Sequence, residues 1–247
     1  MLLQCYNEKS VCSPEFCCNN FCGIMSFVVI SHRGRKTGEK ENSIAAFEKA
    51  IKMGAEGIEC DARLTFDNEV IIIHDRVSET DKEPLTLPEL FLYIKKKEAP
   101  FFIEVKSSSK VLIEKIIEEI EKEDLWQLVH AIGFSTVIKT ALKAQEKYPK
   151  LRVMPFVNFP PFSFIKVPQK SYGLFLGWID EWRGSQFLFR KLIPQQRLEK
   201  LVKLYKKNGF KVMAGVINNE KGLRYFKNAG ITDIVTDEIE LTSKILK

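Results

Sequence analysis

The chain has 247 residues, of which 45% are hydrophobic and 28% charged, a composition that excludes a disordered chain, a collagen-like fibre and a low-complexity linker. The length suits one large α/β domain. Its net charge of +6 comes from 38 basic and 32 acidic residues that alternate through the helical stretches, which argues against a nucleic-acid partner and favours an anionic small molecule such as a phosphate ester.

Five of the six cysteines lie before residue 23. A secreted disulfide scaffold would spread its cysteines through the fold, and this segment lacks the apolar run of a signal peptide. No stretch is apolar for the roughly 18 residues that a membrane span needs. We therefore predict a cysteine-rich extension outside the fold at 1–24, one domain at 25–247 and a cytoplasmic protein. A metal-binding or redox tail at 1–24 is the alternative.

From Phe27 onward, short β-branched runs alternate with stretches of helical period. The predicted strands are FVVISH (27–32), EGIECDARLT (56–65), EVIIIHD (69–75), FFIEVK (101–106), HAIGFS (130–135), LRVMPFV (151–157), YGLFLGW (172–178), KVMAGVI (211–217) and TDIVTD (232–237). Apolar spacing predicts helices at 41–53, 109–123 and 195–208. This alternation is typical of a parallel sheet.

The second and third predicted strands break the alternation, because too few residues separate them for a helix. Asp67-Asn68 offers a two-residue turn and so predicts a hairpin with Asp61 opposite His74, whereas a three-residue turn would shift the pairing by one. Eight parallel strands remain, the number that closes a barrel. We predict a (β/α)8 TIM barrel with an extra antiparallel hairpin strand after the second strand. A doubly wound open sheet is the alternative, but no G-x-G-x-x-G follows the first strand.

Ionisable side chains gather at the carboxyl ends of four predicted strands. They are His32 with Arg33, Glu59 with Asp61, His74 with Asp75, and Glu104 with Lys106. Burying carboxylates is costly unless cations or hydrogen bonds satisfy them. Because barrel active sites lie at the carboxyl ends of the strands, we expect one shared polar site at that mouth.

The residue types at this mouth indicate a chemistry. Glu59, Asp61 and Glu104 suit a hard divalent cation, Mg²⁺ or Ca²⁺. Arg33 and Lys106 would neutralise a phosphate. With an acid and a base, this set predicts metal-assisted cleavage of a phosphodiester.

Two histidines are the candidates for acid and base. Imidazole titrates near neutral pH without perturbation, so His32 and His74 could flank the reacting group. The alternatives are core histidines and, for the carboxylates, structural ion pairs. His130 has no carboxylate neighbour in the sequence and is predicted to be structural. Asn42 precedes an apolar-periodic run, so it could begin a helix, reach the phosphate, or do both.

At these positions the chain resembles the glycerophosphodiester phosphodiesterase family. The matching motifs are HRG (32–34), ENS (41–43), GAEGIECD (54–61), HD (74–75), LTLPEL (85–90), IEVK (103–106), GFS (133–135) and AGITDIVTDEIE (229–240). The match is dense over 27–106 and good over the last thirty residues, while the middle matches only in rhythm.

The resemblance implies a (β/α)8 barrel that releases sn-glycerol 3-phosphate and an alcohol such as choline or ethanolamine. It places the divalent metal on Glu59, Asp61 and Glu104 and makes His32 and His74 catalytic. It also implies a phosphate site lined by Arg33, Glu41 and Lys106.

Two departures from the family concern the substrate. Ala214-Gly215-Val216-Ile217 stands where the family has a W-T-V-N-like string, and only residues 76–100 separate the HD pair from the next strand. The first puts headgroup or glycerol recognition in question, and the second predicts an open mouth. The substrate is therefore a glycerophosphodiester or, alternatively, a lysolipid cleaved by a lysophospholipase D. A silent barrel that binds phosphodiesters or membranes is the rival of another class.

Residues 156–189 are dense in aromatic side chains and also carry basic ones. One interpretation is peripheral contact with a membrane surface or an acyl chain. The other is an ordinary strand and a helix-packing face. An exposed cluster of Trp178 and Trp182 would favour the membrane. The sequence does not indicate an oligomeric state.

Overall fold

The computed structural model describes residues 28–75, 83–134, 136–157, 169–178 and 183–247. The predicted extension at 1–24 lies outside these ranges, so that prediction stays untested.

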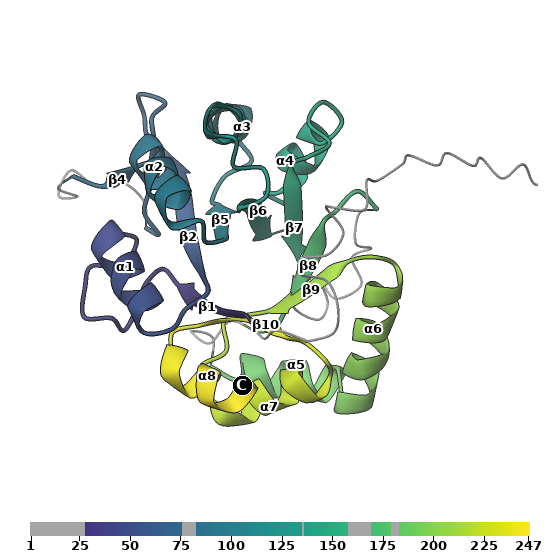
Figure 1. Cartoon of the computed structure of the whole chain (residues 1–247). Coiled ribbons are helices and arrows are strands. Elements are labelled where there is room, and N and C mark those ends of the chain that lie inside the picture. The colour runs from purple at the N-terminus through teal and green to yellow at the C-terminus, as the bar shows by residue number, and fades with distance from the viewer. Residues whose placement is uncertain (1–27, 76–82, 135, 158–168, 179–182) are drawn as a thin grey trace, which may run out of the picture.

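Eight parallel strands close into a barrel, as predicted (Figure 1). In spatial order they are β1 (Val28–His32), β10 (Asp233–Thr236), β9 (Lys211–Ala214), β8 (Gly173–Leu176), β7 (Arg152–Phe156), β6 (Val129–Phe134), β5 (Phe101–Val105) and β2 (Gly57–Leu64). Pairing of β1 with β2 closes the ring, with His32 beside Glu59. Because all eight strands run the same way, their carboxyl ends form one rim.

The predicted hairpin is present, but its register differs from the prediction by one residue. β3 (Val70–Ile72) runs antiparallel to β2, with Leu64 opposite Val70. The turn is longer than two residues, since the Thr65 backbone N–H donates to the Glu69 carbonyl at 2.8 Å and Asn68 is left-handed at φ 64°. Asp61 therefore pairs with Ile73, whose N–H donates to the Asp61 carbonyl, and the predicted pairing of Asp61 with His74 is wrong.

A second short strand, β4 (Leu85–Thr86), pairs with β3 and was not predicted. Two residues carry no alternation of polar and apolar side chains, so periodicity could not reveal it.

Helices surround the barrel in the described part of the chain (Figure 1). They are α1 (Ile44–Lys52), α2 (Leu87–Lys97), α3 (Lys110–Glu123), α4 (Lys139–Ala144), α5 (Ser185–Leu192), α6 (Gln195–Lys207), α7 (Glu220–Asn228) and α8 (Ile239–Leu246). Ser43, not Asn42, caps α1 by accepting from the Ala46 N–H at 3.2 Å. Among the described residues, no helix has the length and apolarity to span a bilayer.

The barrel interior is filled below the rim. Its packed cluster consists of Ile30, Phe102, Ile132, Met154, Phe175, Met213 and Val235. His130 lies beneath it, with its ring stacked on Phe102 at 4.6 Å between centroids. Burial, with the charges of Arg152 and Lys211, lowers the pKa of His130 to about 3, so this imidazole is neutral. A filled interior leaves the carboxyl-end mouth as the place for a site.

Candidate active site

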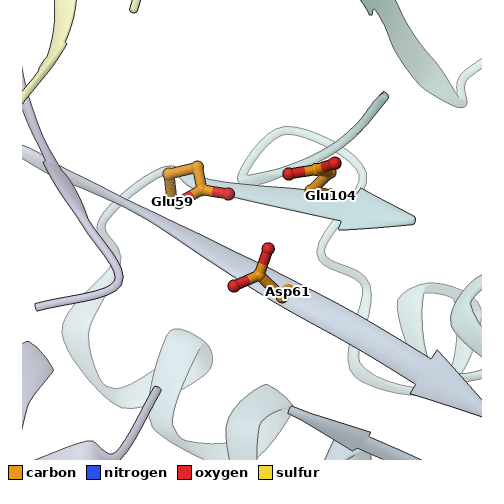
Figure 2. Close-up of side chains that lie close together, drawn as sticks. All are labelled: Glu59, Asp61 and Glu104. Atoms are coloured by element: carbon orange, nitrogen blue, oxygen red, sulfur yellow. The ribbon is translucent and has the colours of Figure 1, made fainter. Parts of the chain in front are cut away.

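Three carboxylates converge at the carboxyl ends of two neighbouring strands. Glu59 and Asp61 lie two apart on β2 and project to the same side, and Glu104 on β5 is the register partner of Asp61. One oxygen from each lies within 4.8 Å of the others. Figure 2 shows the three side chains turned toward one another. The predicted metal ligands are thus brought together.

Asp61 is the most strongly neutralised of the three. Arg33 Nε lies 2.9 Å from one of its oxygens and Lys106 Nζ 2.8 Å from the other. Asn42 Nδ2 donates to the same carboxylate at 2.9 Å. Burial pushes the pKa of Asp61 upward, but the charges of Lys106 and Arg33 outweigh it and hold the pKa below its ordinary value. Asp61 is therefore ionised.

Glu59 and Glu104 are less well compensated. Burial and then the neighbouring Asp61 charge raise the pKa of Glu59 well above its usual range, and its buried Oε2 accepts no hydrogen bond from any described residue. Burial also raises the pKa of Glu104, although Lys106 Nζ lies 2.7 Å from its Oε2. A buried carboxylate oxygen without a donor is a feature that a hard cation would satisfy, so this donor set fits Mg²⁺ or Ca²⁺.

His32, at the end of β1, is oriented by a carboxylate far away in the chain. Its Nδ1 lies 2.8 Å from Oδ1 of Asp237, which follows β10. Burial raises the pKa of Asp237, but hydrogen bonds from His32 and Asn218 and the charge of Arg35 bring it below the ordinary value. An ionised carboxylate only accepts, so Nδ1 donates and Nε2, 3.8 Å from Glu59, is left to exchange a proton.

His74 lies beyond the end of β3, nearer the solvent. Its Nδ1 lies 2.9 Å from Oδ1 of Asp75, and its side chain is 31% exposed. Arg63 Nε donates to the His74 carbonyl at 2.8 Å, which fixes the backbone here. Both imidazoles therefore have a carboxylate at Nδ1.

The cavity at this mouth has a volume of about 360 Å³ and two unlike walls. The charged wall consists of His32, Arg33, Glu59, His74, Glu104 and Lys106. The apolar wall consists of Ile132, Phe134, Phe156, Phe175, Trp178 and Val216. A ligand that fills the cavity meets charge on one side and aromatic carbon on the other.

Glu41 and Asn42 do not line this cavity. They line a smaller neighbouring one of about 200 Å³ that shares His74. Asn42 contacts Asp61 through its side-chain amide, and Glu41 Oε2 lies 3.3 Å from Arg35 Nε. The Asn42 side chain thus contacts one of the three carboxylates, and the Glu41 side chain also lies 3.8 Å from Arg33 Nη1 of the charged wall.

The structure also adds residues that sequence reasoning missed. Asp237 and Arg35 line the cavity, and Asn218 lines it while donating to Asp237 at 2.7 Å. The position of Asp237 could have marked it as a site residue, because it ends the predicted strand TDIVTD in the same way as His32 ends the first predicted strand. Its partner His32 is 205 residues away in the chain, so the sequence alone could not predict that the two residues pair.

One of the two tryptophans in the predicted membrane-contact stretch can be placed. Trp178 is fully buried, with its ring 5.0 Å from that of Phe226. Trp182 lies outside the described residues. Trp178 is therefore part of the core and of the cavity wall.

Known proteins similar to this chain are phosphodiesterases and a lysophospholipase D. The profile of the Glycerophosphoryl diester phosphodiesterase family matches residues 32–130. A Glycerophosphodiester phosphodiesterase of Caldanaerobacter subterraneus subsp. tengcongensis is 26% identical over 246 residues, which cover 90% of this chain and 99% of that protein. Lysophospholipase D GDPD1 of Rattus norvegicus is 23% identical, covering 84% and 82% of the two chains.

A solved structure shares the fold at low sequence identity. It is an Oleispira antarctica phosphodiesterase in complex with the product sn-glycerol-3-phosphate, with a TM-score of 0.66 and 18% identity. The match covers 88% of this chain and 96% of that one.

Proposed function

The chain belongs to the glycerophosphoryl diester phosphodiesterase family, and on that premise we propose that it hydrolyses glycerophosphodiesters to sn-glycerol 3-phosphate and an alcohol. The observation that carries the proposal is the convergence at one cavity of three carboxylates and two histidines, each histidine beside a carboxylate of its own. A silent binding barrel is disfavoured, because mere binding does not require two imidazoles in this arrangement.

Glu59, Asp61 and Glu104 would hold a divalent cation, Mg²⁺ or Ca²⁺. Their buried hard oxygens, including the unpartnered Oε2 of Glu59, support this assignment. When bound, the cation supplies Lewis-acid polarisation of a phosphoryl oxygen.

Arg33 and Lys106 would bind the phosphate from the charged wall. A guanidinium has five N–H donors and an ammonium group three. Arg33 directs Nε–H at Asp61, and Lys106 contacts both Asp61 and Glu104, so each side chain keeps N–H donors for a phosphate. Burial lowers the pKa of Lys106, but the charges of Glu104 and Asp61 more than reverse this and keep it cationic. We assign Asn42 to positioning Asp61, and Glu41 to holding Arg33 and Arg35 at the rim, in place of direct contact with the phosphate.

The two histidines would move the protons. As a water oxygen bonds to phosphorus, one imidazole takes a proton from it. As the P–O bond to the alcohol breaks, the other imidazole gives a proton to the leaving alkoxide. Attack by the neighbouring glycerol hydroxyl, through a cyclic phosphate that water then opens, uses the same two groups.

A lysophospholipase D activity is the second candidate, and the apolar wall favours it. Phe134, Phe156 and Phe175 offer aromatic surface that a glycerol moiety alone does not need. A lysolipid would place its acyl chain along this wall and its phosphate on the charged one.

The cytoplasmic location remains a prediction.

A substrate panel tests both candidates in one experiment. The purified chain is incubated with glycerophosphocholine, glycerophosphoethanolamine or lysophosphatidylcholine, each with Mg²⁺, Ca²⁺ or a chelator. Release of glycerol 3-phosphate supports the first activity, and release of lysophosphatidic acid supports the second. No phosphomonoester from any substrate under any metal condition would refute both.

A further inference from the structure

A surface on α5 combines exposed apolar side chains with positive charge. Phe187 is 71% exposed, and Leu188 and Leu192 are also exposed. Lys191 lies four residues after Phe187, so these four residues share one face of the helix. We call Phe187, Leu188, Lys191 and Leu192 the α5 patch.

The exposure does not come from a loosely attached helix. On the opposite face, Phe189 is fully buried with its ring 5.7 Å from that of Trp178, and Ser185 is buried. Arg190 lies over the Tyr225 ring of α7 at 5.1 Å, and Figure 1 shows α5 beside α7 on the outside of the barrel. The α5 patch is thus a fixed apolar face presented to solvent.

Positive charge is concentrated in the chain segment that carries this patch. Residues 183–207, which span α5 and α6, hold eight Lys or Arg residues and one acid, Glu199. That excess of +7 exceeds the +6 of the whole chain, and it stays at +5 with Asp180 and Glu181, which precede it outside the described residues. Within the described ranges, Lys191, Lys200 and Lys203 have no carboxylate at ion-pair distance.

Helix α2 provides the contrast. Leu92 is 59% exposed there and Lys96 follows four residues later, the same spacing as Phe187 and Lys191. The neighbouring lysines are neutralised, since Lys95 Nζ lies 3.0 Å from Glu123 and Lys97 Nζ 2.7 Å from Glu48. An exposed apolar side chain beside lysines thus occurs on α2 as well, but there the two lysines that flank Lys96 are paired with carboxylates.

The first turn of α5 contacts a loop at the cavity mouth. Gln186 and Asn219 exchange two side-chain hydrogen bonds, each of 3.4 Å. Asn219 follows Asn218, which lines the cavity, so the first turn of α5 is tied to the loop that forms part of the mouth.

We propose that the α5 patch binds the surface of anionic phospholipid membranes. Phe187, Leu188 and Leu192 would enter the boundary between headgroups and acyl chains, and the basic residues of α5 and α6 would contact anionic headgroups. Charge complementarity selects this partner over a second copy of the chain, because two copies would bring their +7 segments together. This proposal narrows the predicted contact through 156–189 to its last residues and extends it along α5, and it is independent of the reaction at the cavity.

Sedimentation of the full chain with vesicles tests the proposal. Phosphatidylcholine vesicles with about 30 mol % phosphatidylglycerol should bind at least about tenfold more tightly than pure phosphatidylcholine. Raising the salt from about 0.1 M to about 0.5 M should weaken binding, because it shortens the range of the attraction. The double variant Phe187→Gln/Lys191→Glu should bind the anionic vesicles at least about tenfold more weakly.

The matched control is Leu92→Gln/Lys96→Glu, which makes the same kind of change at the same spacing on α2 and should keep binding within about twofold. Hydrolysis of soluble substrate and circular dichroism establish that both variants are folded.

No wild-type binding to anionic vesicles would overturn the proposal, as would equal binding to neutral ones. Equal losses in both variants would overturn the assignment to α5, and dimerisation abolished by the α5 variant without vesicle binding would identify a second copy as the partner. If the α5 variant does not fold, the comparisons of anionic with neutral vesicles and of low with high salt still test whether the wild-type chain binds anionic membranes.

Discussion

Asp237 is the residue on which the state of His32 depends. Its ionised carboxylate accepts from Nδ1 and so leaves Nε2 facing the carboxylate cluster. His32 and Asp237 are both buried, and burial makes this hydrogen bond stronger than it would be in water. The protonation form of the imidazole is therefore set by a residue at the opposite end of the sequence.

Asp237→Asn should lower kcat by about 10²–10⁴-fold, because an amide can donate to Nδ1 and favour the wrong tautomer. The matched control is Asp75→Asn. Asp75 bears the same relation to His74 but is 89% exposed, so solvent can replace it and the loss should stay below about tenfold. Equal losses in the two variants would contradict the role given to Asp237.

The pH dependence of stability gives Asp237 a second test. Its pKa is lower in the folded chain than in the unfolded one, so it stabilises the fold above its ordinary pKa. This contribution disappears as the pH falls through the folded-state pKa. Urea unfolding should show a stability gap between wild type and Asp237→Asn at neutral pH that closes in acid.

His74→Ala should lower kcat by about 10²–10⁴-fold while KM changes little, because the imidazole acts on protons in the transition state. Steady-state kinetics of glycerol phosphate release measures both constants. The side chain is partly exposed, so the fold should stay intact by circular dichroism. A folded His74→Ala enzyme with wild-type kcat would end the acid–base assignment.

At the scale of elements, the loop between β1 and α1 depends on the close approach of Gly34 to the helix. Gly34 has φ +70°, and a Cβ placed there would lie 2.6 Å from Ala46 Cβ and 2.9 Å from the Ala46 carbonyl carbon. This loop begins with His32 and Arg33. The packing of Gly34 against α1 therefore helps to determine where these two site residues lie.

Gly34→Ala should destabilise the fold by about 2–4 kcal/mol, from the left-handed backbone and the steric clash together. Gly54→Ala separates the two causes, because Gly54 has φ +99° but no atom within 4 Å of an added Cβ. Its cost should be about 1 kcal/mol. Chemical denaturation measures both values, and similar costs would show that the contact with Ala46 is unimportant.

The existence and type of the main strands could be predicted from local sequence patterns, whereas the exact register between paired strands could not. Short apolar runs that alternate with stretches of helical period predicted all eight barrel strands, and the run that no helix precedes predicted the hairpin, since burial dictates both composition and period. The register of the hairpin depended on a single turn residue, Asn68, in a left-handed conformation. Ser43 took the cap expected of Asn42, because the Asn42 amide contacts Asp61.

The same limit applies to the site. The carboxylates Glu59, Asp61 and Glu104 could be grouped from the sequence, because parallel strands place their carboxyl ends together. Contacts between loops could not, so the partners of His32 and of Glu41 emerged only from the structure.

At the scale of the whole molecule, the buried carboxylates that would bind the cation also lower the stability of the fold when no cation is bound. Burial raises the pKa of Glu59, so its ionised form destabilises the fold above its folded-state pKa, and the cost vanishes below the unfolded-state pKa. A cation bound by the three carboxylates would offset that cost.

Glu59→Gln should therefore stabilise the chain in chelator at neutral pH by about 1–3 kcal/mol, with a difference that narrows as the pH falls. Saturating cation should stabilise wild type by about 2.7 kcal/mol at a hundred times its Kd, and the variant far less. Thermal unfolding with and without Mg²⁺ or Ca²⁺ measures both effects. A cation shift of equal size in the two proteins would remove Glu59 from the ligands.

The most direct test is the initial rate of phosphomonoester release from a glycerophosphodiester across a titration of free divalent cation, for wild type and Glu59→Gln. The account predicts a wild-type rate that is negligible in chelator and rises to saturation, with the variant needing at least about tenfold more cation. A wild-type enzyme that keeps its full rate in excess chelator would contradict it.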